Sequence, residues 1–223
     1  ATVAADEIIV GTALGATTYR LASFNKTINL ATTGVNAMDT GAAPISGWVA
    51  IYAIYNPTTS TAALLGVASP NTFMQTIYGG VNMPAGYTAS ALLTVVPTNA
   101  SSQFKVCCVR GRKVYIQLTA PFIGAPVNAN TAIAGIVPAN AIEITSGELS
   151  IQSTAASVLS LTIVSQLGTL LGQQNLTAGL AAGAALTSNF SGVPLTVSQN
   201  LGIIGNSTAG VPTYSVYVSG YSI

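Results

Sequence analysis

Alternation of apolar and polar residues along the chain predicts many short β-strands. The strongest run is Trp48-Val-Ala-Ile-Tyr-Ala-Ile-Tyr55, in which both alternating faces are apolar. Such a run is typical of a strand in the middle of a sheet that is covered on both sides. Asn56-Pro57 is a turn signal that ends it. We therefore expect residues 48–55 to form a central, buried strand.

Residues 90–118 predict consecutive antiparallel strands. The strand 90–96 is followed by a polar connection, and 104–109 leads through Arg110-Gly-Arg112 into 113–118. A glycine in so short a connection between alternating strands predicts a hairpin. Further short strands are predicted at residues 7–10, 18–22, 27–30, 132–137, 148–152, 158–164, 195–198 and 214–221.

In the last of these, Tyr214, Val216 and Val218 share one face, and Ser215, Tyr217, Ser219 and Tyr221 share the other. Residues 31–47 and 78–87 are rich in glycine and predict loops, the second with glycines that need a positive φ. Residues 62–68 fit a helical turn or a short strand, and residues 180–186 fit helical turns or a loop of small residues. Strands at this spacing favour an antiparallel β-sandwich or jelly roll, as one large domain or two small ones.

Composition supports this and limits the chemistry. Half of the 223 residues are hydrophobic, only 5% are charged, and polarity comes from residues such as 27 Thr and 20 Ser. No Asp, Glu, Lys, Arg or His occurs from Leu149 to Ile223. With no histidine anywhere, the common catalytic triads and zinc sites are excluded, and no phosphate-binding glycine motif is present. We expect no enzyme activity, no metal and no cofactor.

A pair of carboxylates is the remaining catalytic candidate. The acids are Asp6, Glu7, Asp39, Glu143 and Glu148. Glu143 and Glu148 are an odd number of residues apart, so a continuous strand would point them to opposite faces, unlike a glycosidase pair. We interpret both as solvated loop or edge residues.

Charge and hydropathy also indicate partners. A net charge of +1 provides no broad field for nucleic acid, and no run of about 20 apolar residues is present for membrane insertion.

The chain begins at Ala1 without a signal-peptide pattern, which suggests part of a longer protein. Cys107 and Cys108 are adjacent, so they point to opposite faces of a strand. We expect reduced thiols, at least one of them in a core, and assembly in a reducing compartment.

Two groups of residues are candidates for binding. Tyr78, Asn82 and Tyr87 lie in a glycine-rich loop, where the tyrosines are expected to be exposed and can stack on sugars. Arg110, Arg112 and Lys113 form the densest charge in the chain. They fit a solvated hairpin tip that discourages edge-to-edge sheet pairing, or a contact for a phosphate or acidic sugar.

Four stretches resemble a domain of bacteriophage and prophage tail-fibre proteins. They are NLATTGVNAMDTGAAPISGWVAIYAIYNPTT, YGGVNMPAGYTASALLTVVPTN, SSQFKVCCVRGRKVYIQL and SVYVSGYSI. The resemblance covers most of the chain and is strongest from residue 28 to residue 118. These stretches are typical of a fold rather than of a catalytic motif.

The resemblance implies a receptor-binding tip at the end of a tail fibre. Residues 1–42 would connect it to the fibre shaft, and residues 43–223 would form the β-sandwich tip. Such tips are usually homotrimers that bind lipopolysaccharide, capsule or an outer-membrane protein of the host, on a virion assembled in the bacterial cytoplasm. We therefore predict non-catalytic binding of a host glycan through Tyr78, Asn82, Tyr87, Arg110, Arg112 and Lys113. The alternatives are a structural virion protein of capsid or decoration type and, less favoured, a polysaccharide depolymerase.

Overall fold

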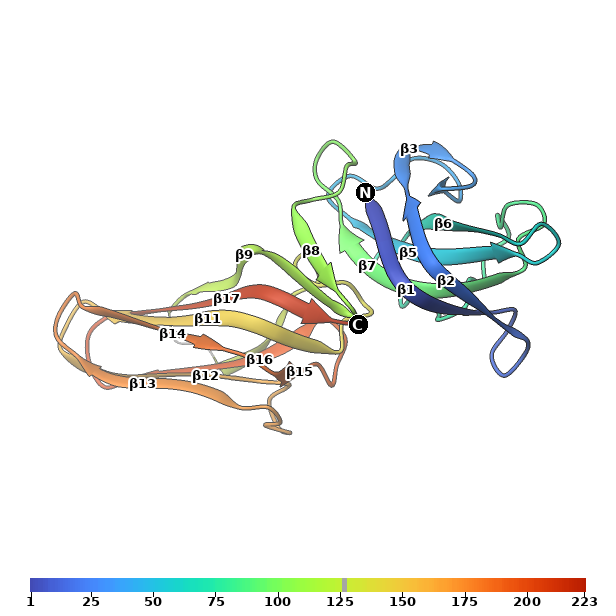
Figure 1. Cartoon of the computed structure of the whole chain (residues 1–223). Helices are drawn as coiled ribbons and strands as arrows, with labels where there is room; N and C mark the ends of the chain where they lie inside the picture. The colour runs from blue at the N-terminus through green and yellow to red at the C-terminus, as the bar shows by residue number, and fades with distance from the viewer. Residues whose placement is uncertain (126–127) are drawn as a thin grey trace. The chain divides into compact units, whose positions relative to one another are not determined.

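The computed structural model describes residues 1–125 and 128–223 (Figure 1). Seventeen strands are its regular elements, and no helix occurs among the described residues. The chain divides into two compact units, unit 1 (Ala1–Lys105) and unit 2 (Val106–Ile223). The all-β prediction is confirmed. Within the described ranges, no helix is long and apolar enough to cross a membrane.

Unit 1 is built on one seven-stranded sheet with the order β2-β1-β7-β5-β6-β4-β3. All its pairings are antiparallel except those of the short β4 with β3 and β6, which are parallel. The strands are β1 (Thr2–Gly11), β2 (Thr18–Thr27), β3 (Asn29–Thr33), β4 (Ala37–Met38), β5 (Trp48–Asn56), β6 (Thr61–Ala68) and β7 (Ala89–Pro97).

The predicted central strand is confirmed as β5. It lies between β7 and β6, and its residues from Trp48 to Ile54 are at most 6% exposed. Residues 62–68, which also fitted a helical turn, are a strand within β6. The β1–β2 hairpin joins the sheet at one pair only, Gly11 with Ser90. Because β2 also contacts β6, although three strands lie between them in the sheet order, the sheet bends back over its own core.

Unit 2 contains two antiparallel sheets, a six-stranded one (β14-β11-β17-β9-β8, with β15 beside β11) and a four-stranded one (β10-β16-β12-β13). The sheets form a sandwich, with the completely buried Ile151 and Val216 on one inner face and Leu161 and Ile203 on the other. The strands are β8 (Cys107–Arg110), β9 (Lys113–Gly124), β10 (Asn128–Ala132), β11 (Glu143–Ser153), β12 (Ser157–Val164), β13 (Gln174–Leu180), β14 (Ala185–Phe190), β15 (Val193–Pro194), β16 (Asn200–Ser207) and β17 (Pro212–Ser222).

The predicted faces of β17 are correct for most of the strand. Tyr214, Val216 and Val218 are completely buried on the inner side, while Tyr217 is half-buried on the other. Tyr221 was expected beside Tyr217 but is also completely buried. Irregular pairing of β17 with β11 between Val218 and Gly220 adds a residue to β17, which shifts its alternation and turns Tyr221 inward.

Some predicted elements of unit 2 are wrong. Residues 133–137 form a turn in which the N–H groups of Ile136 and Val137 both donate to Ile133 O. Residues 195–198 are a bend and turn, and the strand lies further on, in β16. Residues 180–186 are neither helical nor all loop, because the turn at Ala181–Ala184 joins β13 directly to β14.

The predicted boundary after residue 42 falls inside unit 1, where residues 1–42 supply β1 to β4 of the sheet. Whether this segment leads from a fibre shaft stays a prediction. Cys107 and Cys108 are free thiols, as expected, on β8. The expectation of a core cysteine is wrong, because Cys107 is half-buried and Cys108 is exposed on an edge strand. Burial raises the pKa of the Cys107 thiol.

Candidate functional site

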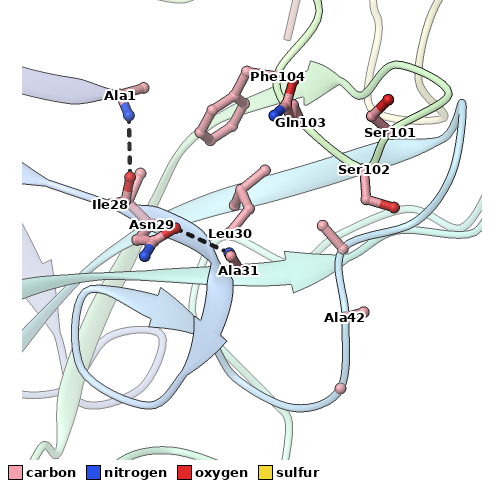
Figure 2. Close-up of a pocket in the computed structure, with 12 residues that line it drawn as sticks. Ala1, Ile28, Asn29, Leu30, Ala31, Ala42, Ser101, Ser102, Gln103 and Phe104 are labelled. Atoms are coloured by element: carbon pink, nitrogen blue, oxygen red, sulfur yellow. Dashed lines mark hydrogen bonds between the residues drawn. The ribbon is translucent and has the colours of Figure 1, made fainter.

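An open cavity of about 480 Å³ lies in the surface of unit 1 (Figure 2). Its walls come from the start of β3, the loop after β4 and the loop after β7. Figure 2 shows the Phe104 ring directed towards the segment that carries Ile28 and Leu30. The lining residues are Ala1, Ile28, Asn29, Leu30, Ala31, Gly41, Ala42, Ala43, Ser101, Ser102, Gln103 and Phe104.

The wall at residues 98–105 is a loop with a fixed backbone. Asn99 Oδ1 accepts the N–H groups of Ser101 at 2.9 Å and Gln103 at 3.0 Å, and Asn99 N–H donates to Gln103 O at 2.8 Å. Thr98 is 3% exposed and donates its hydroxyl to Pro44 O at 2.5 Å. Asparagine side chains commonly accept backbone N–H groups of the turn that they begin. Asn99 holds residues 101–104 in one arrangement against the neighbouring loop.

The side chains on this loop are available for a ligand. The hydroxyls of Ser101 and Ser102 and the carboxamide of Gln103 make no hydrogen bond to any described residue. On the opposite wall, Asn29 Oδ1 accepts the N–H of Ala31 at 3.0 Å. The buried side chains of Ile28 and Leu30 give that wall an apolar base.

The cavity has no charged side chain among the described residues that line it, and its one charged group is the Ala1 ammonium, which donates to Ile28 O at 3.0 Å. It offers neutral amides and hydroxyls beside one aromatic ring. This combination suits an uncharged ligand with many hydroxyl groups and an apolar face, which describes a pyranose sugar. An anionic ligand would find no cationic side chain there.

Tyr78 is buried and hydrogen-bonded within unit 1 instead of being exposed. It is only 9% exposed, and its ring packs edge-on against Tyr52 with centroids 5.7 Å apart. Its Oη donates to Asp39 Oδ2 at 2.9 Å and accepts the N–H of Asn82 at 3.2 Å. Burial, together with the hydrogen bond to Asp39, raises the pKa of Tyr78 to about 12. The expectation that this phenol is exposed is therefore wrong.

The other two loop residues are more accessible. Asn82 is exposed, with its backbone N–H used by Tyr78, while Tyr87 is half-buried. Tyr87 N–H donates to Pro84 O at 3.1 Å and so closes a turn. Gly86 has the expected positive φ, at 82°, whereas Gly79 and Gly80 do not. None of the three predicted contact residues of this loop lines the cavity; that they touch a receptor stays a prediction.

Arg110, Arg112 and Lys113 belong to unit 2 and are all exposed. Arg110 pairs with Lys113 across the β8–β9 hairpin, as predicted, and Gly111 at φ 59° begins its two-residue turn. A positive φ at the first central residue alone is typical of a type II′ turn. Among the described residues, the one salt bridge is Arg20–Glu7, so these three cations have no carboxylate partner. Their part in receptor binding also stays a prediction.

The expectation that Glu143 and Glu148 point to opposite faces of a strand is wrong. Both lie on β11, where irregular pairing around Ser146 adds a residue to the alternation. Glu143 and Glu148 therefore face the same, outer side, with Ile144 and Gly147 turned inward. Five residues of strand place them roughly 15 Å apart, beyond the about 5–9.5 Å of a glycosidase pair.

Sequence reasoning did not identify the cavity. Its loop begins as the predicted polar connection after residue 96, but Phe104 was predicted to start the strand 104–109, whereas β8 begins only at Cys107. Asn99 four residues before Gln103 is an available sign of a self-bonded turn. No sequence pattern pairs this loop with residues 28–31, about 70 positions earlier in the chain.

Comparison with known proteins identifies no family. No family model matches the chain, and no curated protein matches significantly. A solved structure titled "Structure of infectious bursal disease virus Gx strain" matches at 14% identity with a TM-score of 0.26, over 82% of this chain and 53% of that one. The chain thus spans about half of that viral protein's length. The similarity to that viral structure is weak.

Proposed function

We propose that the protein is a non-catalytic attachment protein of a virion and that unit 1 binds an uncharged glycan of the host surface. The observation that carries this proposal is the cavity, where the Phe104 ring adjoins the unpaired side chains of Ser101, Ser102 and Gln103. The resemblance of the chain to tail-fibre tips supports a host lipopolysaccharide or capsule as the source of the glycan.

The arrangement fits sugar recognition physically. Sugar hydroxyls both donate and accept hydrogen bonds, as do hydroxyl and carboxamide groups. The C–H face of a pyranose packs on an aromatic ring without any charge. Because Asn99 already fixes the loop, binding costs little additional ordering of the backbone.

The same side chains support binding without hydrolysis. The cavity lining, as far as the structure describes it, contains no carboxylate to transfer a proton to a glycosidic bond. Glu143 and Glu148 belong to the other unit and stand too far apart to act as a pair. We expect a host polysaccharide incubated with the protein to keep its size, and a shortened product would favour the depolymerase alternative.

Phe104→Ala tests the proposal. We expect it to weaken binding to host polysaccharide about tenfold or more, since aromatic anchors at binding sites commonly contribute over 1 kcal/mol. Gln103→Ala should weaken binding as well. Phe73→Ala is the matched control, because Phe73 is 69% exposed in unit 1 but outside the cavity. Binding unchanged by Phe104→Ala, or equally weakened by Phe73→Ala, would contradict the site.

A second candidate is a structural virion subunit that binds no glycan. The uncharged, open strand β14 at one edge of unit 2 favours it, because such edges promote assembly. This function predicts incorporation with other virion proteins and no binding to host cells. Light scattering would also test the homotrimer that the tail-fibre resemblance implies.

A further inference from the structure

We propose that the open edge of β14 is an assembly surface that pairs, strand to strand and antiparallel, with β14 of a second copy of this chain. The surface is the β14 edge, residues Ala185–Phe190. This inference concerns unit 2 alone and does not depend on glycan binding in unit 1.

The β14 edge lacks a partner on one side. β14 is hydrogen-bonded to β11, and no described strand pairs with its other side. Its first five residues are exposed and only Phe190 is buried. Leu186 is 38% exposed although Ile151, directly opposite on β11, is completely buried. The inner side of β14 therefore extends past the cover that the facing sheet gives to β11.

The edge is held ready for pairing. Ala184 N–H donates to Ala181 O at 3.1 Å in the turn before β14, where Gly183 has a φ of 75°. Gly183 N–H also donates to Ser153 O at 2.9 Å, and Gln152 Nε2 donates to Gly183 O at 3.3 Å. These contacts fix the strand to β11, so a partner would find its backbone groups already in extended order.

Charge distinguishes this edge from two others. Proteins commonly protect an open edge with charged side chains, proline or a bulge. β2 carries Arg20 and Lys26, and β8 carries Arg110, which pairs with Lys113 at the start of β9. β14 has none of these protections: it contains no charged residue, no proline and an unbroken register with β11. β3 and β10 are also uncharged, but each has only five residues. The edge strand β13 is uncharged and has seven residues, but its alternate positions are buried or half-buried, whereas the first five residues of β14 are all exposed.

A second copy fits the electrostatics of this edge. Antiparallel pairing of identical strands about a two-fold axis brings equivalent residues near one another. At β2 or β8 this would oppose like charges, which is unfavourable. At β14 every register opposes only Ala, Leu, Thr, Ser, Asn and Phe side chains. The pairing joins the six-stranded sheets of two copies into one continuous sheet.

Thr187→Lys tests the pairing. Thr187 is exposed and lies opposite Ser150 on the outer side of the sheet, so a lysine there projects into solvent in a single copy. In the pair it brings two ammonium groups together across the axis. We expect light scattering over a concentration series to show self-association of the wild type and at least tenfold weaker association of Thr187→Lys.

The matched control is Thr213→Lys. Thr213 is also exposed, but it lies on β17, between β11 and β9. Association kept by Thr213→Lys and lost by Thr187→Lys supports the proposal. A wild type that stays monomeric at every concentration overturns it, as does any assembly, trimers included, that Thr187→Lys leaves intact. If Thr187→Lys fails to fold, hydrogen exchange of the wild type decides: β14 amides must exchange more slowly at high protein concentration than at low concentration.

Discussion

The phenol of Tyr78 donates a hydrogen bond to the Asp39 carboxylate at 2.9 Å and so ties the β6–β7 loop to the end of β4. The same phenol oxygen receives the N–H of Asn82. Tyr78 N–H donates to Ser90 Oγ at 2.9 Å, and Tyr52 Oη donates to Gln75 O at 2.7 Å. Tyr78 and Tyr52 thus anchor the long loop between β6 and β7.

Tyr78→Phe should therefore destabilise unit 1. It leaves the ring packing in place but removes a charge-assisted hydrogen bond and the acceptor for Asn82 N–H. We expect a loss of about 1–3 kcal/mol in the free energy of unfolding, measured by urea denaturation. Tyr87→Phe is the control, because no described residue bonds its hydroxyl, and it should cost less than about 0.5 kcal/mol. Equal losses for the two variants would contradict the role of Tyr78.

Stability should fall at high pH. The pKa values of Tyr52 and Tyr78 are both raised from 10.0 to about 12 in the folded protein, mainly by burial. Between these values the unfolded chain loses the phenol protons that the folded chain keeps, so the unfolding free energy decreases as pH rises from about 10 to about 12. Ultraviolet titration of tyrosinate should show these phenols ionising late in wild type, with one late group fewer in Tyr78→Phe. Ionisation of all tyrosines near their ordinary pKa, without unfolding, would contradict this.

Gly86→Ala should cost more than Gly15→Ala. Both glycines have a positive φ, 82° and 73°, so each substitution carries about 1–2 kcal/mol of backbone strain. A Cβ at Gly15 meets no atom within 4 Å, whereas one at Gly86 meets the Asn56 side chain. That side chain cannot yield freely, because its Oδ1 accepts the N–H groups of Thr58 and Thr59. We expect about 1–3 kcal/mol of additional destabilisation by thermal unfolding.

Asn99 should be replaceable by Asp but not by Ala. Only its side-chain oxygen is used, as the acceptor for Ser101 and Gln103 N–H, and Asp supplies the same acceptor. Asn99→Ala should lose about 1–2 kcal/mol of stability and weaken glycan binding, since the cavity loop loses its fixed shape. Calorimetric titration with host polysaccharide measures both variants. Full binding by Asn99→Ala would show that the loop does not need this turn.

The parts of the fold that the sequence predicts are strands whose own pattern of apolar and polar residues indicates how they are buried. The strand 48–55 is apolar on both faces, and the strand 158–164 alternates cleanly, so each was predicted where it lies. β13 and β14, with sequences QNLTAGL and ALTSNF, carry no alternation that signals burial. They are strands because β12 and β11 pair with them, which is a tertiary effect.

In the candidate sites, too, features that depend on local sequence were predictable and features that depend on distant residues were not. The β8–β9 hairpin tip was predictable from glycine and charge, because a tight turn is local. The burial of Tyr78 depends on Asp39, 39 residues earlier, which no local pattern reveals. The face of Glu148 relative to Glu143 depends on the irregular pairing at Ser146. A strict two-residue period fails wherever such a bulge adds a residue.

The place of β17 in the sheet has a consequence for biosynthesis. This strand pairs with β11 on one side and β9 on the other, so residues 212–222 occupy an interior position between strands made long before them. Unit 1 has all its strands once residue 97 is made, and it can fold on the ribosome. The six-stranded sheet cannot be completed until Ser222 leaves the exit tunnel, because β17 is the strand between β11 and β9. During that interval nascent unit 2 exposes inner faces that are dry in the finished protein, and chaperone demand should concentrate there.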